Sequence, residues 1–400
     1  MNSRHFCWVN SMKDRKKPAI RFKGFTEDWE QRKLGDIADR VVRKNINNES
    51  TLPLTISAQY GLIDQVTYFN NRVASRDVSN YYLVLNGEFA YNKSTSDGFP
   101  YGAVKRLDLY RKGVLSTLYI VFSIKNKKKT NSDFLTFFFD TDRWHKGVYE
   151  RAAEGARNHG LLNISADDFF DIDLSLPKSE QEQAVIGAYF KQLDNLITLH
   201  QRKYDKLVNV KKSMLEKMFP KNGESIPDIR FSGFTEDWEQ RKLGEVLRTL
   251  PFKPFLKIPD QDGKYEIIQQ GNEPIIGYAN GEPCEDFRNT VIFGDHTLSL
   301  YKPKQPFFVA TDGVRILQGT NDMDGYYLLS LLEGNSPKSE GYKRYYSILV
   351  DREVLFTKNY YEQVKIGLYF KQLDNLITLH QRKLEKLKNI KKSCLEKMFI

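Results

Sequence analysis

Apolar positions recur alternately four and three residues apart along two stretches of the chain, Val185–Phe219 and Lys365–Phe399. This spacing, sustained over nearly five heptads, is typical of a coiled-coil seam. A helix of that length would extend roughly 50 Å. We predict two long helices that pack antiparallel on each other. The predicted seam residues are Phe190, Leu193, Ile197, His200 and Leu207 in the first stretch and Phe370, Leu373, Ile377, His380 and Leu387 in the second.

Two sequence repeats organise the rest of the chain. The segment YFKQLDNLITLHQRK is identical at Tyr189–Lys203 and Tyr369–Lys383, and GFTEDWEQRKLG is identical at Gly24–Gly35 and Gly233–Gly244. The regions between these repeats do not resemble each other in sequence. Both contain aromatic and β-branched runs broken by turn residues, which predicts mixed domains with much strand. The expected fold is α+β, with two mixed α/β domains separated by two long antiparallel coiled-coil helices and a pseudo-twofold internal repeat.

The order of these segments predicts the domain boundaries. We expect a disordered lead over 1–17, a first domain over 18–178, a long helix over 179–220, a second domain over 221–360 and a second long helix over 361–400.

Each GFTEDWEQRKLG motif is expected to form a two-turn helix. A threonine before two carboxylates suits an N-cap, and a glycine suits the C-terminal end. These positions are Thr26 and Gly35 in the first copy and Thr235 and Gly244 in the second. The motif tryptophans, Trp29 and Trp238, are interpreted as packing residues in preference to docking residues.

The net positive charge of the chain is compatible with DNA as a partner but does not establish it. The net charge of the chain is +10. Val185–Phe219 has seven basic and three acidic residues, and Lys365–Phe399 has nine and three, so the two stretches carry the whole excess. A solvated basic flank on a coiled coil explains this as well as DNA binding does. Three widely spaced cysteines fit a reducing cytosol, and no apolar run is long enough to span a membrane.

The sequence lacks the motifs of several enzyme classes. It has no phosphate-binding G-x-x-x-x-G-K-S/T loop, no adenine-methylase N/D-P-P-Y/F signature and no G-x-S-x-G elbow. Asp262 and Lys264 follow Pro259-Asp260 too closely to complete a nuclease site. The histidines show no metal-ligand spacing. We therefore expect neither catalysis nor a metal site in this chain.

The paired long-helix segments, LD-I--H-RK---L---KK--LE-MF, the paired F-GF-E-WE--KLG motifs and the two dissimilar regions between them resemble the specificity subunits of type I restriction–modification systems. The resemblance extends over almost the whole chain from Pro18. One departure is Thr357-Lys358 before the second helix, where Pro177-Lys178 precedes the first. Pro177 would fix the entry into its helix, so the second domain is expected to join its helix differently.

The resemblance implies two target recognition domains, each of which reads one half of a bipartite double-stranded DNA site. It also implies that the helices set the spacing and bind two methyltransferase subunits, with two restriction (motor–nuclease) subunits completing the complex. S-adenosylmethionine would then belong to the methyltransferase, and ATP and Mg to the motor subunit, with no cofactor in this chain. The expected location is cytoplasmic.

Polar and basic loops are the candidate DNA contacts, because arginine pairs with guanine and asparagine with adenine at base edges. The candidates in the first domain are Lys93, Ser94, Thr95, Tyr101, Lys105, Arg106, Arg157, Asn158 and His159. Those in the second are Asp295, His296, Thr297, Thr311, Asp312, Lys343 and Arg344. Ordinary surface turns are the alternative for any single residue.

Two alternatives remain open. His200 and His380 occupy equivalent seam positions, where a polar residue specifies register or, alternatively, acts as a proton switch. The whole chain could also be a scaffold with two protein-binding domains on a coiled-coil stalk. A steep fall of DNA affinity with salt would distinguish DNA binding from that scaffold.

Overall fold

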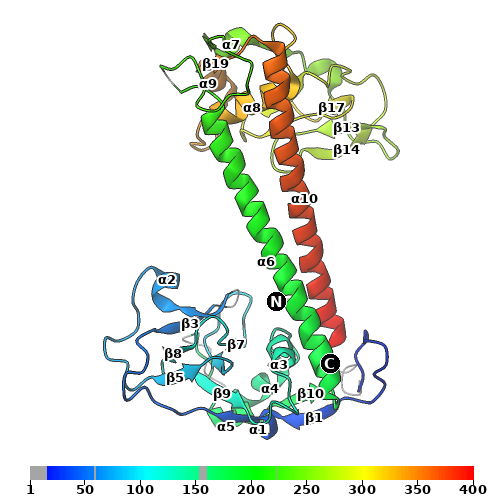
Figure 1. The fold of residues 1–400 in the computed structure, drawn as a ribbon. Coiled ribbons are helices and arrows are strands. Elements are labelled where there is room, and N and C mark those ends of the chain that lie inside the picture. The colour runs from blue at the N-terminus through cyan, green and yellow to red at the C-terminus, as the bar shows by residue number, and fades with distance from the viewer. Residues whose placement is uncertain (1–15, 58–59, 153–159, 222) are drawn as a thin grey trace. The chain divides into compact units, whose positions relative to one another are not determined.

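The computed structural model describes residues 16–57, 60–152, 160–221 and 223–400 (Figure 1). The chain divides into two compact units, which we call unit 1 (residues 1–198 and 385–400) and unit 2 (residues 199–384). Each unit holds one globular region and one part of each long helix, α6 (Glu180–Lys217) and α10 (Tyr360–Met398). In the described part of the chain, no helix is long and apolar enough to cross a membrane.

The globular region of unit 1 is mixed α/β. A four-stranded antiparallel sheet has the order β2-β9-β6-β7, and three further strand pairs are β1–β10, β3–β4 and β5–β8. The strands are β1 (Glu30–Lys33), β2 (Ala38–Arg40), β3 (Leu54–Ser57), β4 (Gly61–Asp64), β5 (Tyr82–Leu85), β6 (Phe89–Asn92), β7 (Ala103–Arg106), β8 (Lys112–Leu115), β9 (Ile120–Ile124) and β10 (Asp173–Leu176). The helices are α1 (Leu34–Ile37), α2 (Gln65–Phe69), α3 (Ser132–Phe138), α4 (His145–Arg151) and α5 (Ala166–Phe170).

Aromatic side chains fill the core of unit 1. Phe89 of β6 stacks on Phe122 of β9, with ring centroids 5.2 Å apart, and Tyr91 of β6 stacks on Phe169 of α5 at 4.3 Å. The same core takes in both long helices, because Phe190 of α6 is completely buried and lies near the ring of Phe399, just beyond α10, with centroids 5.7 Å apart. The long helices and the first globular region therefore share one hydrophobic core.

The globular region of unit 2 has a four-stranded sheet arranged like the β2-β9-β6-β7 sheet of unit 1. We call these two sheets the inner sheets. The four-stranded antiparallel sheet of unit 2 has the order β12-β18-β15-β16, and β14-β13-β17 and β11–β19 form the other two sheets. The strands are β11 (Glu239–Lys242), β12 (Leu247–Leu250), β13 (Tyr265–Ile268), β14 (Ile275–Ala279), β15 (Thr290–Gly294), β16 (Leu300–Tyr301), β17 (Phe307–Val309), β18 (Val314–Gly319) and β19 (Glu353–Phe356). The helices are α7 (Leu243–Val246), the 3-10 helix η2 (Lys253–Phe255), α8 (Gly325–Asn335) and α9 (Tyr346–Val350).

The two inner sheets correspond strand by strand, although the sequences differ. In both units, the strand that follows the short motif (β2 or β12) lies at one edge, and a later strand (β9 or β18) pairs beside it. A helix that packs on a long helix then follows, α3 in unit 1 and α8 in unit 2. Outside this shared sheet and the pairs β1–β10 and β11–β19, unit 1 has two strand pairs and unit 2 has a three-stranded sheet.

The prediction of a two-turn helix in each GFTEDWEQRKLG motif is wrong. Glu30–Lys33 forms strand β1, which pairs antiparallel with β10, and Glu239–Lys242 forms β11, which pairs with β19. Gly35 lies inside the short helix α1 and does not end a helix; a Cβ there would approach Phe170 O at 3.2 Å. Pairing with a strand more than a hundred residues away overrides the local helix signals.

The packing role of the motif tryptophans is confirmed. Trp29 is 5% exposed and Trp238 is 3% exposed. The Nε1–H of Trp29 donates to Glu182 Oε1 at 3.3 Å, which ties the motif to the first turn of α6. Trp29 thereby anchors the first globular region to α6, whereas Trp238 packs edge-on against Phe219, with ring centroids 5.6 Å apart.

The predicted seam residues lie at buried or half-buried positions. Phe190, Leu193, Phe370 and Leu373 are buried, and Ile197, His200, Leu207, Ile377, His380 and Leu387 are half-buried.

Polar contacts also join the two long helices within each unit. In unit 1, Lys391 Nζ of α10 lies 2.7 Å from Asp194 Oδ1 of α6. In unit 2, His200 Nδ1 lies 2.9 Å from His380 Nδ1, and Lys211 Nζ lies 2.6 Å from Asp374 Oδ1. Within unit 2 these contacts run in opposite chain directions, so α6 and α10 are antiparallel there.

Thr357 substitutes for the proline that precedes α6. Its side chain is buried, and its hydroxyl donates to Glu362 Oε2 at 2.7 Å. Its carbonyl accepts a hydrogen bond from Gln363 Nε2 at 2.7 Å, as the carbonyl of Pro177 does from Gln183 Nε2 at 2.9 Å. The entry into α10 is thus fixed by a hydroxyl where the entry into α6 has a proline ring.

Candidate nucleic-acid interface

Three loops chosen as candidate DNA contacts lie against one another in unit 2. They are the β15–β16 turn with Asp295, His296 and Thr297, the β17–β18 turn with Thr311 and Asp312, and the α8–α9 connection with Lys343 and Arg344. The backbone N–H of Asp295 donates to Gly313 O at 2.9 Å, and that of Tyr345 donates to Asp295 O at 2.7 Å. The structure therefore brings together residues from three separate segments of the sequence.

Asp295 lies beneath this loop cluster. Its side chain is 1% exposed, and its carboxylate accepts hydrogen bonds from Arg315 Nη2 at 2.9 Å and from the backbone N–H of Tyr346 at 2.9 Å. The negative charge is thus paired inside the unit and holds two of the loops together. In this structure Asp295 presents no oxygen to an external base.

Gln270, on the β13–β14 turn, connects the same loops from another side. Its Oε1 accepts a hydrogen bond from the backbone N–H of His296 at 3.0 Å. A Cβ at Gly313 would stand 2.5 Å from Gln270 Nε2, and one at Gly294 would stand 2.7 Å from Gln270 Cβ. A side chain at Gly294 would thus collide with Gln270 close to its backbone, whereas at Gly313 the amide end of Gln270 would have to move. Neither Gln270 nor Arg315 could be singled out from the sequence, because each lies within or beside a strand-like run.

The exposed side chains of the loop cluster carry its chemistry. Thr297, Thr311, Asp312 and Arg344 are exposed, and Lys343 pairs with Glu340 at 2.7 Å. The imidazole of His296 is half-buried, and the ring of Tyr342 stacks on it. Hydroxyls, a guanidinium and an aromatic face are groups that contact bases and phosphates. Tyr342 was not among the candidates, although it adjoins two of them in GYKRYY.

The β6–β7 loop is the corresponding candidate surface in unit 1. The backbone N–H and the hydroxyl of Thr95 donate to Gly160 O at 2.7 and 3.1 Å, and Lys93 Nζ donates to Ile164 O at 3.3 Å. Ser94 is exposed beside them. These contacts hold the loop against the segment that follows residue 159.

Tyr101 ends this loop next to helix α4. Its ring lies over His145, with centroids 4.9 Å apart, and Tyr149 lies edge-on to it at 6.4 Å. Burial lowers the pKa of the His145 imidazole and outweighs the opposing charge of Asp142. His145 is therefore neutral at pH 7 and acts as part of an aromatic cluster. His145 and Tyr149 were not singled out from the sequence.

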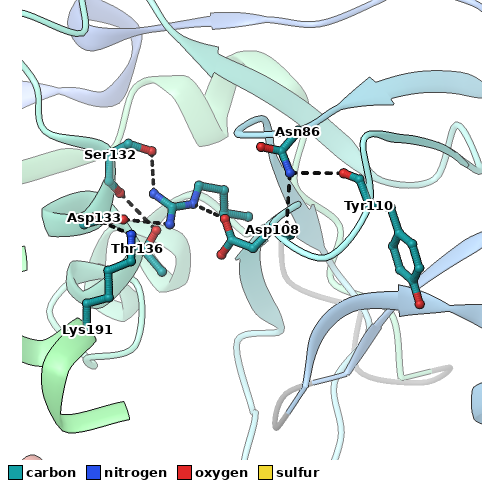
Figure 2. Close-up of polar contacts among 8 residues, drawn as sticks. Asn86, Asp108, Tyr110, Ser132, Asp133, Thr136 and Lys191 are labelled. Carbon is teal, nitrogen blue, oxygen red and sulfur yellow. Dashed lines mark hydrogen bonds and ion pairs between the residues drawn. The ribbon is translucent and has the colours of Figure 1, made fainter. Parts of the chain in front are cut away.

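Lys105 and Arg106 point into unit 1 and make ion pairs there. Lys105 Nζ lies 2.6 Å from Asp140 Oδ1. Arg106 is 12% exposed and donates to Asp108, Ser132 and Asp133 at 2.6–2.7 Å. Figure 2 shows these partners, with Lys191 of α6 also directed at Asp133. In this structure both cations fasten β7 to neighbouring elements.

The charge network lowers the pKa of Asp133. Burial of the carboxyl acts in the opposite direction, but hydrogen bonds and charge from Arg106 and then Lys191 outweigh it. The carboxylate therefore stays ionised and links the inner sheet to helix α6. The network positions the first globular region on its helix.

Arg157, Asn158 and His159 lie outside the described residues. In the part of the chain that is described, no cluster of three or more histidine, cysteine, aspartate or glutamate residues could hold a metal ion.

Comparison with known proteins identifies a family for nearly half of the chain. Residues 26–209 match the family model described as type I restriction modification DNA specificity domain. The chain is 26% identical over 228 residues to the type I restriction enzyme MjaVIII specificity subunit of Methanocaldococcus jannaschii, covering 55% of this chain and 49% of that protein. It is 23% identical over 402 residues to the putative type I restriction enzyme MjaX specificity subunit of the same organism, covering 92% and 91%. The chain thus spans about half of the first relative and most of the second.

The fold is similar to that of a solved structure. The crystal structure of the type I restriction–modification system S subunit from M. genitalium superposes with a TM-score of 0.59 and 14% identity, covering 96% of this chain and 99% of that one. At this level of identity the similarity concerns the fold.

Proposed function

Because residues 26–209 belong to the type I restriction modification DNA specificity domain family, we propose that this chain is the non-catalytic, sequence-specific DNA-binding subunit of a type I restriction–modification complex. Its target is a bipartite, asymmetric duplex site. Unit 1 reads one half-site through the β6–β7 loop, and unit 2 reads the other through the loop cluster around Gln270.

The observation that carries this proposal is an anchoring framework that recurs in both units beneath loops that differ. Arg21 pairs with Glu182 at 2.6 Å in unit 1, and Arg230 pairs with Glu362 at 2.6 Å in unit 2. The side chain of Gln183 accepts from the backbone at the start of α3, and that of Gln363 does so before α8. A duplicated enzyme would keep its active-site loops alike. An anchoring framework that is the same in both units, with loops that differ, is what we expect of two domains that recognise different DNA sequences.

The long helices carry two roles in this proposal. As an antiparallel coiled-coil spacer with pseudo-twofold symmetry, they set the separation of the half-sites. They also bind two methyltransferase subunits, through which two motor–nuclease subunits join the complex. The methyltransferase then supplies S-adenosylmethionine chemistry and the motor subunit uses ATP and Mg. Exposed leucines on the helices support the docking role: Leu376 is 44% exposed and Leu379 is 45% exposed, three residues apart on one face of α10.

Selection of bound duplexes from a random pool tests the proposal. The full chain would be co-expressed with its methyltransferase partner, and the recovered sequences would be aligned. Recovery of two defined half-sites with a fixed gap, and an affinity that falls steeply with salt, is the expected result. Recovery of random sequence, or binding that is independent of salt, would exclude the proposed function and favour the scaffold.

A further inference from the structure

Tyr342 is an exposed aromatic residue at the tip of the loop cluster in unit 2. Its side chain is 87% exposed. A tyrosine ring in water leaves a large apolar surface without a partner, and such rings are common where proteins bind ligands. The ring therefore suits an external partner that offers a flat apolar face.

The loop beneath Tyr342 is held in place by Tyr345. Tyr345 is completely buried, and its hydroxyl donates to Gly341 O at 2.7 Å and accepts from the backbone N–H of Glu340 at 2.7 Å. Gly341 has a φ of +87°, a backbone conformation that favours glycine. The tip is thus fixed in the free protein, so binding would not have to order it.

His296 supports the ring from below. The two rings are parallel within 3°, and their centroids lie 4.7 Å apart. His296 is itself fixed by Gln270 through its backbone and by a contact of 3.2 Å between its Nδ1 and Lys343 O. A carbonyl oxygen can only accept, so Nδ1 is the donor in this contact. The ring of His296 thus lies alongside Tyr342, while Tyr342 stays 87% exposed.

The segment 338–344 carries three cations and one carboxylate, a balance that favours a polyanion. Arg344 is exposed and, within the residues that the structure describes, makes no hydrogen bond or ion pair. Lys338 is also exposed and, within the same described residues, likewise makes no hydrogen bond or ion pair. An apolar peptide would gain nothing from these cations, whereas a nucleic acid presents phosphates next to aromatic bases.

From this geometry we propose that Tyr342, supported by His296, inserts at a base step of the half-site read by unit 2, packs its ring on the nucleobase unstacked there and is a specificity-determining residue. Arg344 contacts an adjacent phosphate. The inference rests on the proposed DNA-binding function and assigns the contact within it.

Duplex binding by the full chain with its methyltransferase partner tests the inference. Replacement of a stacking aromatic by alanine removes about 1–3 kcal/mol per base, so Tyr342→Ala should weaken binding of the selected duplex by about 5-fold to 150-fold. It should also relax the selected sequence at one or two positions of a single half-site. Tyr342→Phe, which keeps the ring, should retain binding and selectivity. Tyr361→Ala is the matched control, because Tyr361 of unit 2 is 76% exposed and lies on α10.

Salt dependence separates the roles of the two residues. Tyr342→Ala should leave the slope of log affinity against log salt unchanged, because the ring contacts no phosphate. Arg344→Gln should reduce the slope by about one. Since both side chains are exposed, the thermal unfolding midpoint should stay at the wild-type value in each variant.

The outcomes distinguish this inference from the proposed function. If the wild-type chain selects a split site and Tyr342→Ala selects the same site with the same affinity, the inference is wrong and the proposed function stands. If Tyr342→Ala loses the methyltransferase partner and keeps DNA binding, the ring is a protein contact and the inference is again wrong. If the wild-type chain selects no split site, both are wrong.

Discussion

Glu182 is a carboxylate almost completely removed from solvent. It is 1% exposed and accepts two hydrogen bonds from Arg21, at 2.6 and 2.7 Å. Removal of one member of such a buried pair leaves the other charge without compensation, which is strongly unfavourable. The residue therefore fixes the approach of the short motif to α6.

Glu182→Gln should lower the free energy of unfolding by about 2 kcal/mol, because the part-buried Arg21 guanidinium would lose its counter-charge. Denaturant unfolding of the full chain measures this change. Asp28→Asn is the control, since its partner Lys17 lies 3.3 Å away and both side chains are about half exposed. The control should change stability by less than about 1 kcal/mol. Equal effects of the two substitutions would refute the anchoring role of Glu182.

The surroundings of His200 predict that stability depends on pH. Their Nδ1 atoms lie 2.9 Å apart, a distance that suits one shared proton and disfavours two charged rings. Burial lowers the pKa of His200, and the nearby charges of His380, then Lys383 of α10 and Lys203 of α6, lower it further. The unfolded chain therefore binds a proton at His200 at a higher pH than the folded chain does.

Because an unfolded histidine titrates near pH 6.5, stability should fall as the pH drops through that value toward the lower pKa of folded His200. His200→Gln should flatten this dependence. Thermal unfolding midpoints between pH 8 and pH 5 measure it, and the difference between wild type and variant removes the contribution of the other histidines. Identical pH profiles would leave the histidine pair with the register role alone.

Individual contacts in the globular regions were the hardest to predict from the sequence. Lys105 and Arg106 follow a glycine-rich loop, which indicated DNA contact, but their partners Asp140 and Asp133 lie 35 and 27 residues further along the chain. Asp295 likewise pairs with Arg315 on another strand. Loop composition indicates which segments are exposed. It does not indicate which side chains turn inward, because that depends on strand pairing.

Among the elements, the long helices could be predicted closely and the short motifs could not. The 4-3 spacing of α6 and α10 is a local signal that persists over many turns, so the expected ranges 179–220 and 361–400 lie close to Glu180–Lys217 and Tyr360–Met398. In the motif, threonine and glycine mimic helix ends, but β1 and β11 are fixed by partner strands late in each domain. Helices carry their own hydrogen bonds, whereas strands depend on distant partners.

The exposed leucine face of α10 predicts a binding surface for a partner helix. Leu376→Asp combined with Leu379→Asp should weaken binding of the methyltransferase by at least about 100-fold, because burial of each leucine contributes about 1.5–3 kcal/mol. Co-purification and titration of the two subunits measure the loss. Asn389→Asp, at an exposed position of the same helix, should bind as the wild type does. Undiminished binding by the double variant would exclude this face as the docking surface.

At the scale of the whole molecule, the proposed role of the two helices is that of a spacer. Its length would set the distance between the half-sites. Seven residues added to each helix would extend it by about 10 Å, close to three base pairs at 3.4 Å each. Seven residues also span nearly two whole turns, so the buried seam would stay on the same side within about 20°. Insertion of one heptad into both α6 and α10 should therefore lengthen the selected gap by about three base pairs and leave both half-sites unchanged.

A five-residue insertion into both helices separates length from register. It adds about 7 Å but rotates one end of each helix by about 140° relative to the other, which turns the seam to solvent. This variant should unfold more easily and select no fixed gap, whereas the heptad variant should remain folded. An unchanged gap in a folded heptad variant would show that the globular regions set the spacing without the helices. A gap that lengthens in the heptad variant would show that the two helices set the distance between the half-sites. Those helices are paired through the seam that the hydrophobic pattern of the sequence defines.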